Sequence, residues 1–217
     1  MTGDVTIVAQ GKQRHSGLAG NIADASDVVV WLVPLDGVAA PQAAPARPPQ
    51  IIQRNKTFVP HVLAVQVGTV VQFPNEDPFF HNIFSLFDGK RFDLGLYEAG
   101  STRSVRFDRA GVSFLFCNIH PEMSAVVIAV ETPYFALSNR SGHWVIPGVP
   151  DGRYEMHVWY ERSSPEGISS LTRPVVISAS TRALDRVRVV ENPNFTLAHK
   201  NKYGQDYVPP PRSDYTP

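Results

Sequence analysis

Short runs that alternate between apolar and polar residues, each followed by turn-forming residues, make up most of the chain. Runs of this length that are rich in Val, Ile and Phe predict β-strands rather than helices. Before residue 132 we expect strands at 4–9, 27–33, 63–67, 70–73, 82–84, 103–107, 112–117 and 124–130. After it we expect strands at 134–138, 143–146, 155–160, 175–178 and 184–190. The pattern predicts an all-β protein built from β-sandwiches.

The composition agrees with many short strands and limits the partners of the protein. Of the 217 residues, 43% are hydrophobic, which supplies a core, and the 19 prolines and 15 glycines favour frequent turns. The 20 basic and 20 acidic residues balance, and no Lys or Arg run marks a nucleic-acid surface. No apolar stretch approaches the roughly 18 residues of a membrane helix, and no signal peptide is visible. We expect neither a nucleic-acid partner nor a membrane span.

The only cysteine begins a motif whose residues are possible metal ligands. Cys117 is followed by His120 and Met123 in the segment Cys-Asn-Ile-His-Pro-Glu-Met, and His81 starts an apolar run 36 residues earlier. Thiolate, imidazole and thioether donors together favour copper, and a trigonal His2Cys set with a long axial Met is the type 1, or blue, copper site. We therefore predict one copper ion held by His81, Cys117, His120 and Met123. Asn82 is expected to brace the two ligand segments by hydrogen bonding.

The same residue types also allow simpler interpretations than a metal site. A lone cysteine is usually a small buried hydrophobe, but the histidines and the methionine at ligand spacing favour copper over that interpretation. His15, His143, His157 and His199 lack ligand-like neighbours and are interpreted as ordinary residues. His61 follows a proline and is interpreted as a surface or hydrogen-bonded residue rather than as a second metal site. The sequence has no His-x-His pair for a trinuclear oxidase cluster and no second cysteine for a binuclear copper site. We expect that the protein is not an enzyme.

Residues 57–131 resemble the cupredoxins, the small blue-copper electron carriers. The likeness rests on Phe58-Val59-Pro60-His61, the Gly68 turn, Phe73-Pro74-Asn75-Glu76-Asp77, His81-Asn82, Phe92-Asp93-Leu94-Gly95 and Cys117-Asn118-Ile119-His120-Pro121. The ligand loop is most similar to that of the amicyanins, and the wider pattern resembles periplasmic plastocyanin-like or methylamine-utilization proteins. The resemblance implies a Greek-key cupredoxin sandwich, one copper ion that alternates between Cu(I) and Cu(II), and a periplasmic location.

Residues 132–192 resemble a second sandwich, of the carboxypeptidase regulatory-like or transthyretin-like kind. The likeness rests on turns at Gly142, Pro147-Gly148 and Pro150-Asp151-Gly152 and on the strand that follows. Two further strands precede these turns in that fold, and residues 1–36 look like those strands. The resemblance therefore implies that the copper domain is inserted into the second sandwich.

Two segments of the chain show no strand pattern. Residues 37–56 include the Pro- and Ala-rich stretch 41–49, which predicts an extended surface linker. The C-terminal tail, residues 193–217, has no periodicity and is expected to lie loosely on its own domain.

Taken together, these features favour electron transfer. We expect a blue copper protein that carries single electrons between periplasmic redox proteins, such as a cytochrome or a dehydrogenase. Transfer would be outer-sphere, through the exposed edge of the His120 imidazole. A periplasmic copper carrier or storage protein with the same ligands is the alternative that the sequence leaves open.

Overall fold

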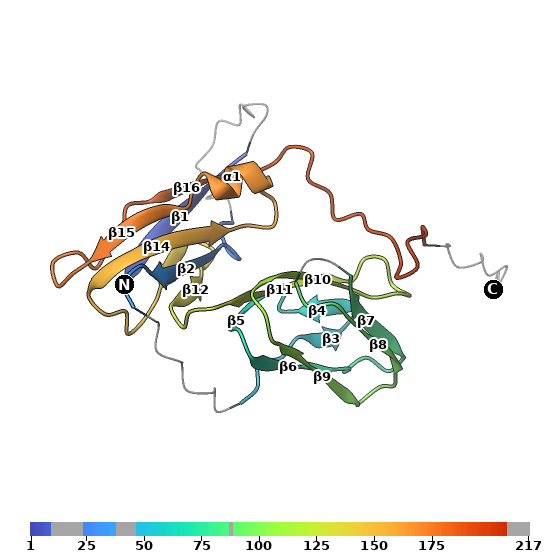
Figure 1. Ribbon diagram of the computed structural model, residues 1–217. Coiled ribbons are helices and arrows are strands. Elements are labelled where there is room, and N and C mark those ends of the chain that lie inside the picture. Colours follow the sequence, from blue (N-terminus) through green and yellow to red (C-terminus); the bar gives the residue numbers. More distant parts are fainter. Residues whose placement is uncertain (10–23, 38–46, 87–88, 208–217) are drawn as a thin grey trace, which may run out of the picture.

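The protein consists almost entirely of β-strands, which confirms the predicted all-β class. Its computed structural model describes residues 1–9, 24–37, 47–86 and 89–207 (Figure 1). The elements are β1 (Thr2–Val8), β2 (Val29–Pro34), β3 (Ile52–Arg54), β4 (Thr57–Val59), β5 (Val62–Gln66), β6 (Thr69–Pro74), β7 (His81–Ser85), β8 (Phe92–Tyr97), β9 (Thr102–Phe107), β10 (Gly111–Phe116), β11 (Ser124–Val130), β12 (Phe135–Leu137), β13 (His143–Val145), β14 (Gly152–Trp159), α1 (Pro165–Ser169), β15 (Arg173–Ile177) and β16 (Val187–Val190). No helix among the described residues is long and apolar enough to cross a membrane.

Strands β3 to β11 form one sandwich, which we call the metal-side sandwich. Its main sheet has the order β5-β11-β10-β7-β8, and the pairs β3-β4 and β6-β9 complete it. Alternate side chains of these strands point inward, as the period of two along a strand requires. They form one core, in which Phe73, Phe107 and Leu115 are fully buried together with Cys117 and Met123.

The remaining strands form a second sandwich. A sheet of order β12-β2-β14-β15 packs against a sheet of order β13-β1-β16. Their inward side chains make a separate core, which includes Leu32, Trp144 and Met156. Gly3 lies against the Trp144 ring so closely that a Cβ atom there would be 2.4 Å from a ring carbon, so only glycine fits.

The second sandwich draws its strands from both ends of the chain. β1 pairs parallel with β16, and β2 pairs antiparallel with β12 and β14. Residues 52–130, which form the metal-side sandwich, therefore lie between two segments that fold together.

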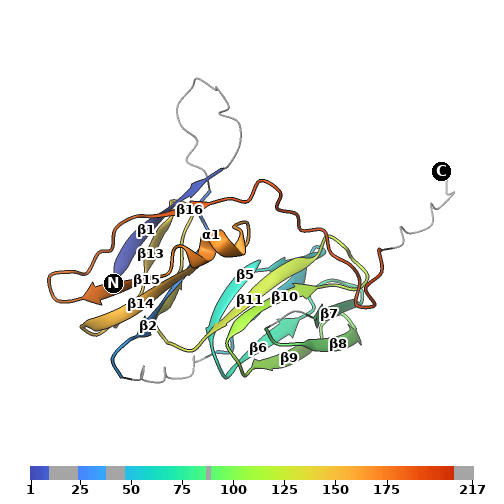
Figure 2. The same cartoon turned by 45° about the horizontal axis from the view of Figure 1, so that its top comes forward.

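The two sandwiches share a third apolar cluster where they meet (Figure 2). Val29 and Trp159 from the second sandwich pack with Val62, Val126 and Ile128 from the sheet of β5 and β11. A polar contact joins the same region, because His61 Nε2 lies 2.7 Å from Glu161 Oε2. The metal-side sandwich is therefore held against the second sandwich by buried side chains as well as by the chain connections.

Most predicted strands occur within a few residues of their expected positions, but the sequence pattern missed four elements. β3 and β4 form a hairpin closed at Asn55 and Lys56, which both have φ of 55°. Two successive positive φ values suit a tight hairpin turn, but this pair is not the Asn-Gly that usually marks one. β3 lies within the predicted linker 37–56, whereas part of the Pro- and Ala-rich stretch lies outside the described residues. β8 and α1 were also missed.

Candidate metal centre

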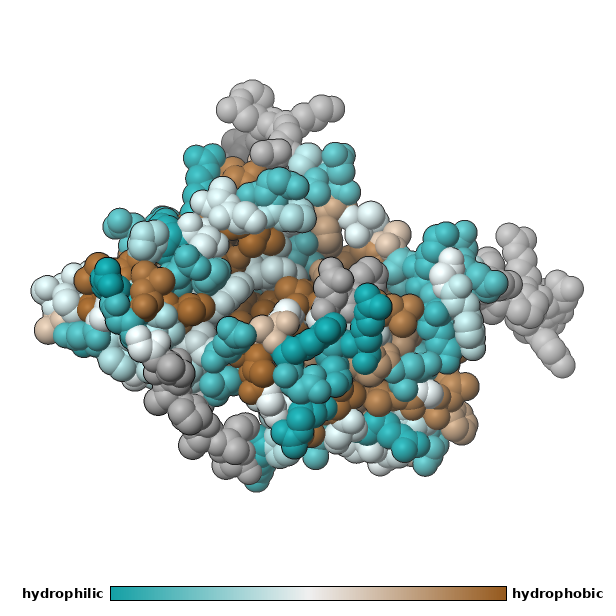
Figure 3. Space-filling view, viewed as in Figure 1, coloured by the Kyte–Doolittle hydropathy of each residue, from teal (hydrophilic) through white to brown (hydrophobic). Residues whose placement is uncertain are grey.

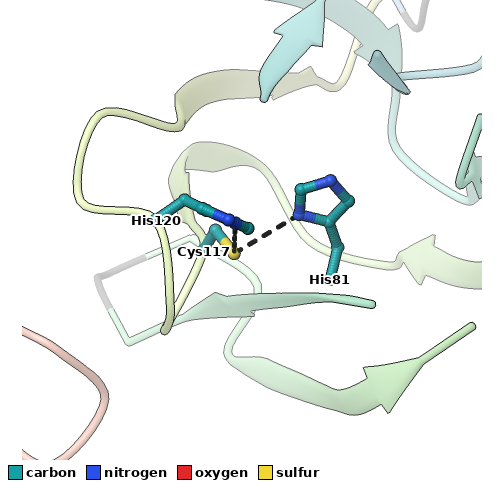
Figure 4. Close-up of side chains that lie close together, drawn as sticks. All are labelled: His81, Cys117 and His120. Atoms are coloured by element: carbon teal, nitrogen blue, oxygen red, sulfur yellow. Dashed lines mark hydrogen bonds between the residues drawn. The ribbon is translucent and has the colours of Figure 1, made fainter. Parts of the chain in front are cut away.

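The predicted copper ligands meet at one end of the metal-side sandwich. His81 is the first residue of β7, and Cys117 directly follows β10. These two strands are neighbours in the main sheet, with Phe84 opposite Phe116, so the sheet brings the ends of both segments together. His120 lies in the loop that connects β10 to β11, and its ring faces the same point (Figure 4).

The three donor atoms form a triangle of the size that a metal ion requires. Cys117 Sγ lies 3.8 Å from His81 Nδ1 and 3.7 Å from His120 Nδ1. All three ligand atoms lie within 4.8 Å of one another. Transition-metal bonds of roughly 2.0–2.3 Å to nitrogen and sulfur give separations of about 3.7 Å in a trigonal arrangement. The donor set therefore fits a copper ion in both chemistry and spacing.

Met123 lies at the same site, although its role as the axial ligand stays a prediction. Its side chain is fully buried in the core cluster that contains Cys117. Its backbone closes the ligand loop, because the Met123 N–H donates to His120 O at 3.1 Å and the Cys117 N–H donates to Met123 O at 3.3 Å. These bonds tie the three predicted ligands of the loop, Cys117, His120 and Met123, to one another.

Burial sets the protonation of the donors in the absence of a cation. Burial raises the pKa of the Cys117 thiol, and the backbone N–H groups of Asn82, Ile119 and His120 oppose that rise. Burial, followed by the nearby His81, lowers the pKa of His120. A lowered pKa favours the neutral imidazole, which is the form that binds metal. The thiolate, by contrast, needs a positive charge beside it, and a bound copper ion supplies one.

Asp77, which sequence reasoning missed, orients the first histidine. Its Oδ2 atom lies 2.7 Å from His81 Nε2, and both side chains are buried. The backbone N–H groups of Asn55 and Lys56 donate to its two oxygens at 2.6 and 2.9 Å. Burial opposes ionisation, but these bonds and the one to His81 outweigh it and lower the pKa of the Asp77 carboxyl. A carboxylate that accepts from Nε2 leaves the Nδ1 lone pair of His81 free to face Cys117.

Asn82 occupies the bracing position that its place in the sequence suggested. Its amide nitrogen donates to Asp93 Oδ1 on β8 at 2.7 Å. Its oxygen accepts from the Asn118 N–H of the ligand loop at 3.3 Å. Asn82 thus connects β8 and the ligand loop on either side of β7.

The other histidines are not part of this cluster. Among the described residues, His81, Cys117 and His120 form the one group of three or more His, Cys, Asp or Glu side chains spaced to hold a metal. His61 bonds Glu161 and the carbonyl of Ser124, and His157 stacks on Trp31. His143 pairs with Asp4 at the surface, and His15 lies outside the described residues.

His199 contacts the metal-side sandwich, although the tail was expected to lie loosely on its own domain. Its ring stacks on Phe116, the residue before Cys117, with centroids 3.9 Å apart. The prediction that the tail lies loosely on its own domain is therefore wrong for the described residues up to Tyr207. It failed because side-chain contacts rather than a strand ladder hold this segment, and such contacts leave no periodicity in a sequence.

No protein-family model and no curated protein sequence matches the chain. Several solved structures, by contrast, are similar to part of the chain. A novel purple cupredoxin from Nitrosopumilus maritimus is 28% identical, with 38% of this chain and 99% of that chain covered and a TM-score of 0.35. A copper-containing nitrite reductase from Thermus scotoductus is 27% identical, with 45% and 25% covered and a TM-score of 0.38. Amicyanin from Paracoccus versutus is 21% identical, with 40% and 85% covered and a TM-score of 0.36.

Each of these alignments covers less than half of this chain. The chain also spans only a quarter of the nitrite reductase. The resemblance of residues 132–192 to a carboxypeptidase regulatory-like sandwich stays a prediction.

Proposed function

We propose that the protein is a type 1 copper electron carrier of the periplasm. The observation that carries the proposal is the triangle of His81, Cys117 and His120, in which the first two residues are fully buried and the donor separations are 3.7 and 3.8 Å. A copper ion bound there supplies a centre that gains and loses one electron. The protein supplies a donor set between the preferences of Cu(I) and Cu(II), so that neither state needs a large rearrangement.

The scaffold holds these donors in place. His81 and Cys117 lie at the ends of the adjacent strands β7 and β10, and neither side chain is exposed to solvent. Asp77 fixes the ring of His81 from behind. Ligands held by packing and by outer hydrogen bonds move little when the charge at the centre changes, which favours fast electron transfer.

The ligand loop offers a docking surface around His120. Unlike His81, His120 is partly exposed, and Phe79 lies beside it with ring centroids 5.7 Å apart. Phe80 and Ile119 expose 56% and 45% of their surface. We propose that a redox protein, such as a cytochrome or a dehydrogenase, docks here and exchanges an electron through the His120 edge. Small, short-lived contacts are typical of redox encounters.

Long-range charge contributes little to this docking. The chain has a formal net charge of zero, and hydrophilic and hydrophobic residues intermingle over the face drawn in Figure 3. Steering by an extended field needs a surface with an excess of one sign. The proposed contact is therefore local and apolar at its centre.

We also propose that the protein is not an enzyme. One similar structure is that of a copper-containing nitrite reductase, but the chain spans only a quarter of it. Among the described residues a single cluster has metal-ligand spacing, and it holds the donors of a carrier site. A second metal that activates a substrate has no ligand set in that part of the chain.

Electron transfer and copper delivery are separated by one pair of measurements on the copper-loaded protein. We expect electron exchange with a cytochrome c in stopped-flow mixing, together with retention of Cu(I) against a copper chelator. Rapid loss of Cu(I) with slow electron exchange would instead indicate a copper carrier. Phe80→Ser should slow the exchange with the cytochrome, whereas Leu35→Ser, at an exposed apolar residue of the second sandwich, should leave it unchanged.

A further inference from the structure

The C-terminal segment, residues 192–207, crosses from the second sandwich to the metal centre. After β16 the chain leaves the second sandwich and runs to the end of the metal-side sandwich where β7 and β10 lie, as both ribbon views show (Figures 1 and 2). Its last described residues contact the ligand loop on both sides of Cys117. None of these contacts involves a copper ligand side chain.

On one side, Lys202 completes a closed ring of hydrogen bonds. Its ammonium donates to Asp93 Oδ2 at 2.7 Å, and its backbone N–H donates to Asn118 Oδ1 at 3.0 Å. Asn82 closes the ring, because it donates to Asp93 Oδ1 and accepts from the Asn118 N–H. The ring connects β7, β8, the ligand loop and the C-terminal segment, and it includes the residues that directly follow His81 and Cys117.

On the other side, Tyr207 holds the backbone of the cysteine itself. Its hydroxyl donates to the Cys117 carbonyl oxygen at 2.8 Å and lies 3.0 Å from His199 Nε2. The His199 ring in turn stacks on Phe116 at 3.9 Å. Residues 116, 117 and 118 are thus each contacted by the same short segment.

We propose that Lys202 and Tyr207 are positioning residues of the copper centre. They act through Asn118 and the Cys117 carbonyl, and they fix the start of the ligand loop so that the thiolate and His120 keep their separation. This inference rests on the proposed copper function for its effect on the metal, but not for its effect on the loop.

The charge of Lys202 and the small number of competing contacts support the assignment. The hydrogen bond to Asp93 raises the pKa of Lys202, so the ammonium stays charged and bonded. The Lys202 and Asp93 side chains are 23% and 38% exposed, so this is a partly exposed ion pair, and its place in the ring of hydrogen bonds matters more than its charge. Within the ligand loop, two backbone bonds join Cys117, His120 and Met123, and the outer contacts add to them in fixing the chain.

The first test is made on the metal-free protein, by amide hydrogen exchange measured by NMR. The amides to follow are those of Cys117, Asn118 and Met123, each of which donates a hydrogen bond to an oxygen atom. A typical hydrogen bond changes an equilibrium about fivefold, so Lys202→Met and Tyr207→Phe should each speed exchange at these amides by about that factor. Lys202→Arg should restore the slower rate, because it keeps the charge and the donor.

Two variants serve as matched controls. Lys200→Met removes an exposed lysine from the same segment. Tyr154→Phe removes a hydroxyl that donates to the Pro150 carbonyl at 3.0 Å in the second sandwich. Both should leave exchange at the three loop amides unchanged. Loop exchange that is equally slow in Lys202→Met, Tyr207→Phe and the controls would overturn the proposal.

A second test uses the copper-loaded protein and has a different readout. If the segment positions the thiolate, Lys202→Met and Tyr207→Phe should change the copper hyperfine splitting and the reduction potential and speed copper release, while the controls should not. A protein that gains no blue-copper spectrum at all would refute the copper function, yet the exchange experiment would still decide whether the segment fixes the loop. Altered exchange with unaltered spectrum and potential would overturn the positioning role.

Discussion

The Nε2 atom of His81 lies 2.7 Å from Oδ2 of Asp77, and the two side chains are 0% and 5% exposed. The carboxylate is itself held by the backbone N–H groups of the β3-β4 turn. Hydrogen bonds therefore connect the β3-β4 turn to Asp77 and Asp77 to His81, whose Nδ1 atom faces Cys117. This arrangement links the fold of the sandwich to the electronic properties of the ligand, since a carboxylate partner makes an imidazole a stronger donor.

Replacing Asp77 with Asn should weaken copper binding. The amide keeps the size of the side chain but loses the negative charge, so His81 becomes a poorer donor. Loss of such an outer partner typically costs about 10- to 100-fold in metal affinity, and Cu(II) should suffer more than Cu(I). We therefore expect lower Cu(II) affinity in competition titrations and a higher reduction potential.

The matched control for this change is Asp108→Asn. Asp108 is an exposed carboxylate that pairs with Lys90 at 2.8 Å, away from the ligands. Asp108→Asn should leave both the Cu(II) affinity and the reduction potential as in the unaltered protein. Equal behaviour of the two variants would show that Asp77 serves only the hairpin.

Replacing Cys117 with Ser should abolish the visible colour of the copper-loaded protein while the fold persists. The thiolate is the donor whose charge transfer to copper gives a blue site its band, and a serine hydroxyl has no equivalent transition. The sandwich core contains many other fully buried side chains, so circular dichroism should be little changed. A folded Ser variant that keeps the same band would rule out Cys117 as the ligand.

Met123 tests the predicted axial position. Met123→Gln puts a harder oxygen donor near the copper, which favours Cu(II), so the reduction potential should fall. Met123→Leu keeps an apolar side chain of similar size without any donor, so the potential should rise. Voltammetry that finds the same potential in both variants would place Met123 in the core but not on the metal.

The contact between the sandwiches should depend on pH through His61. Its hydrogen bond with Glu161 raises the pKa of His61 despite burial, which acts in the opposite direction. A raised pKa stabilises the folded state fully below the ordinary value of about 6.5. That stabilisation is lost as the pH rises through the folded-state pKa.

The measurement is the difference in thermal midpoint between the unaltered protein and Glu161→Gln, followed from about pH 5 to pH 8. We expect the largest difference at the acidic end and a smaller one as His61 loses its proton. Glu98→Gln, at an exposed carboxylate on the metal-side sandwich, should show no such trend. A difference that grows with rising pH would contradict the assignment.

Much of the fold could be predicted because most strands are short runs of apolar or alternating apolar and polar residues between turn-forming residues. The strand Ser124–Val130 occurs at its predicted bounds, since a continuous apolar run buried on both faces has few alternatives. β8 (Phe92–Tyr97) was missed because Gly95, with φ of 67°, interrupts its apolar pattern. The helix α1 is only five residues long, and its start depends on a cap by Ser164 and Pro165 at its first position rather than on periodicity.

In the site, too, residues close in sequence could be predicted, whereas contacts between residues far apart in sequence could not. Cys117 and His120 could be recognised because their spacing is local, and His81 because it opens a strand. Asp77 could not, because its role depends on a turn that returns its carboxylate to His81 and on a hairpin more than 20 residues earlier. Tyr207 bonds the Cys117 carbonyl from 90 residues away, and no pattern in either segment reports that contact.

The central claim is that His81, Cys117 and His120 hold one copper ion in a trigonal site. It is tested most directly by adding one equivalent of Cu(II) to the full chain and recording the visible and electron paramagnetic resonance spectra together. We expect an intense thiolate-to-copper band in the visible region and the narrow parallel hyperfine splitting of a type 1 site. A colourless protein, or one with the wide splitting of tetragonal Cu(II) bound by nitrogen and oxygen alone, would contradict it.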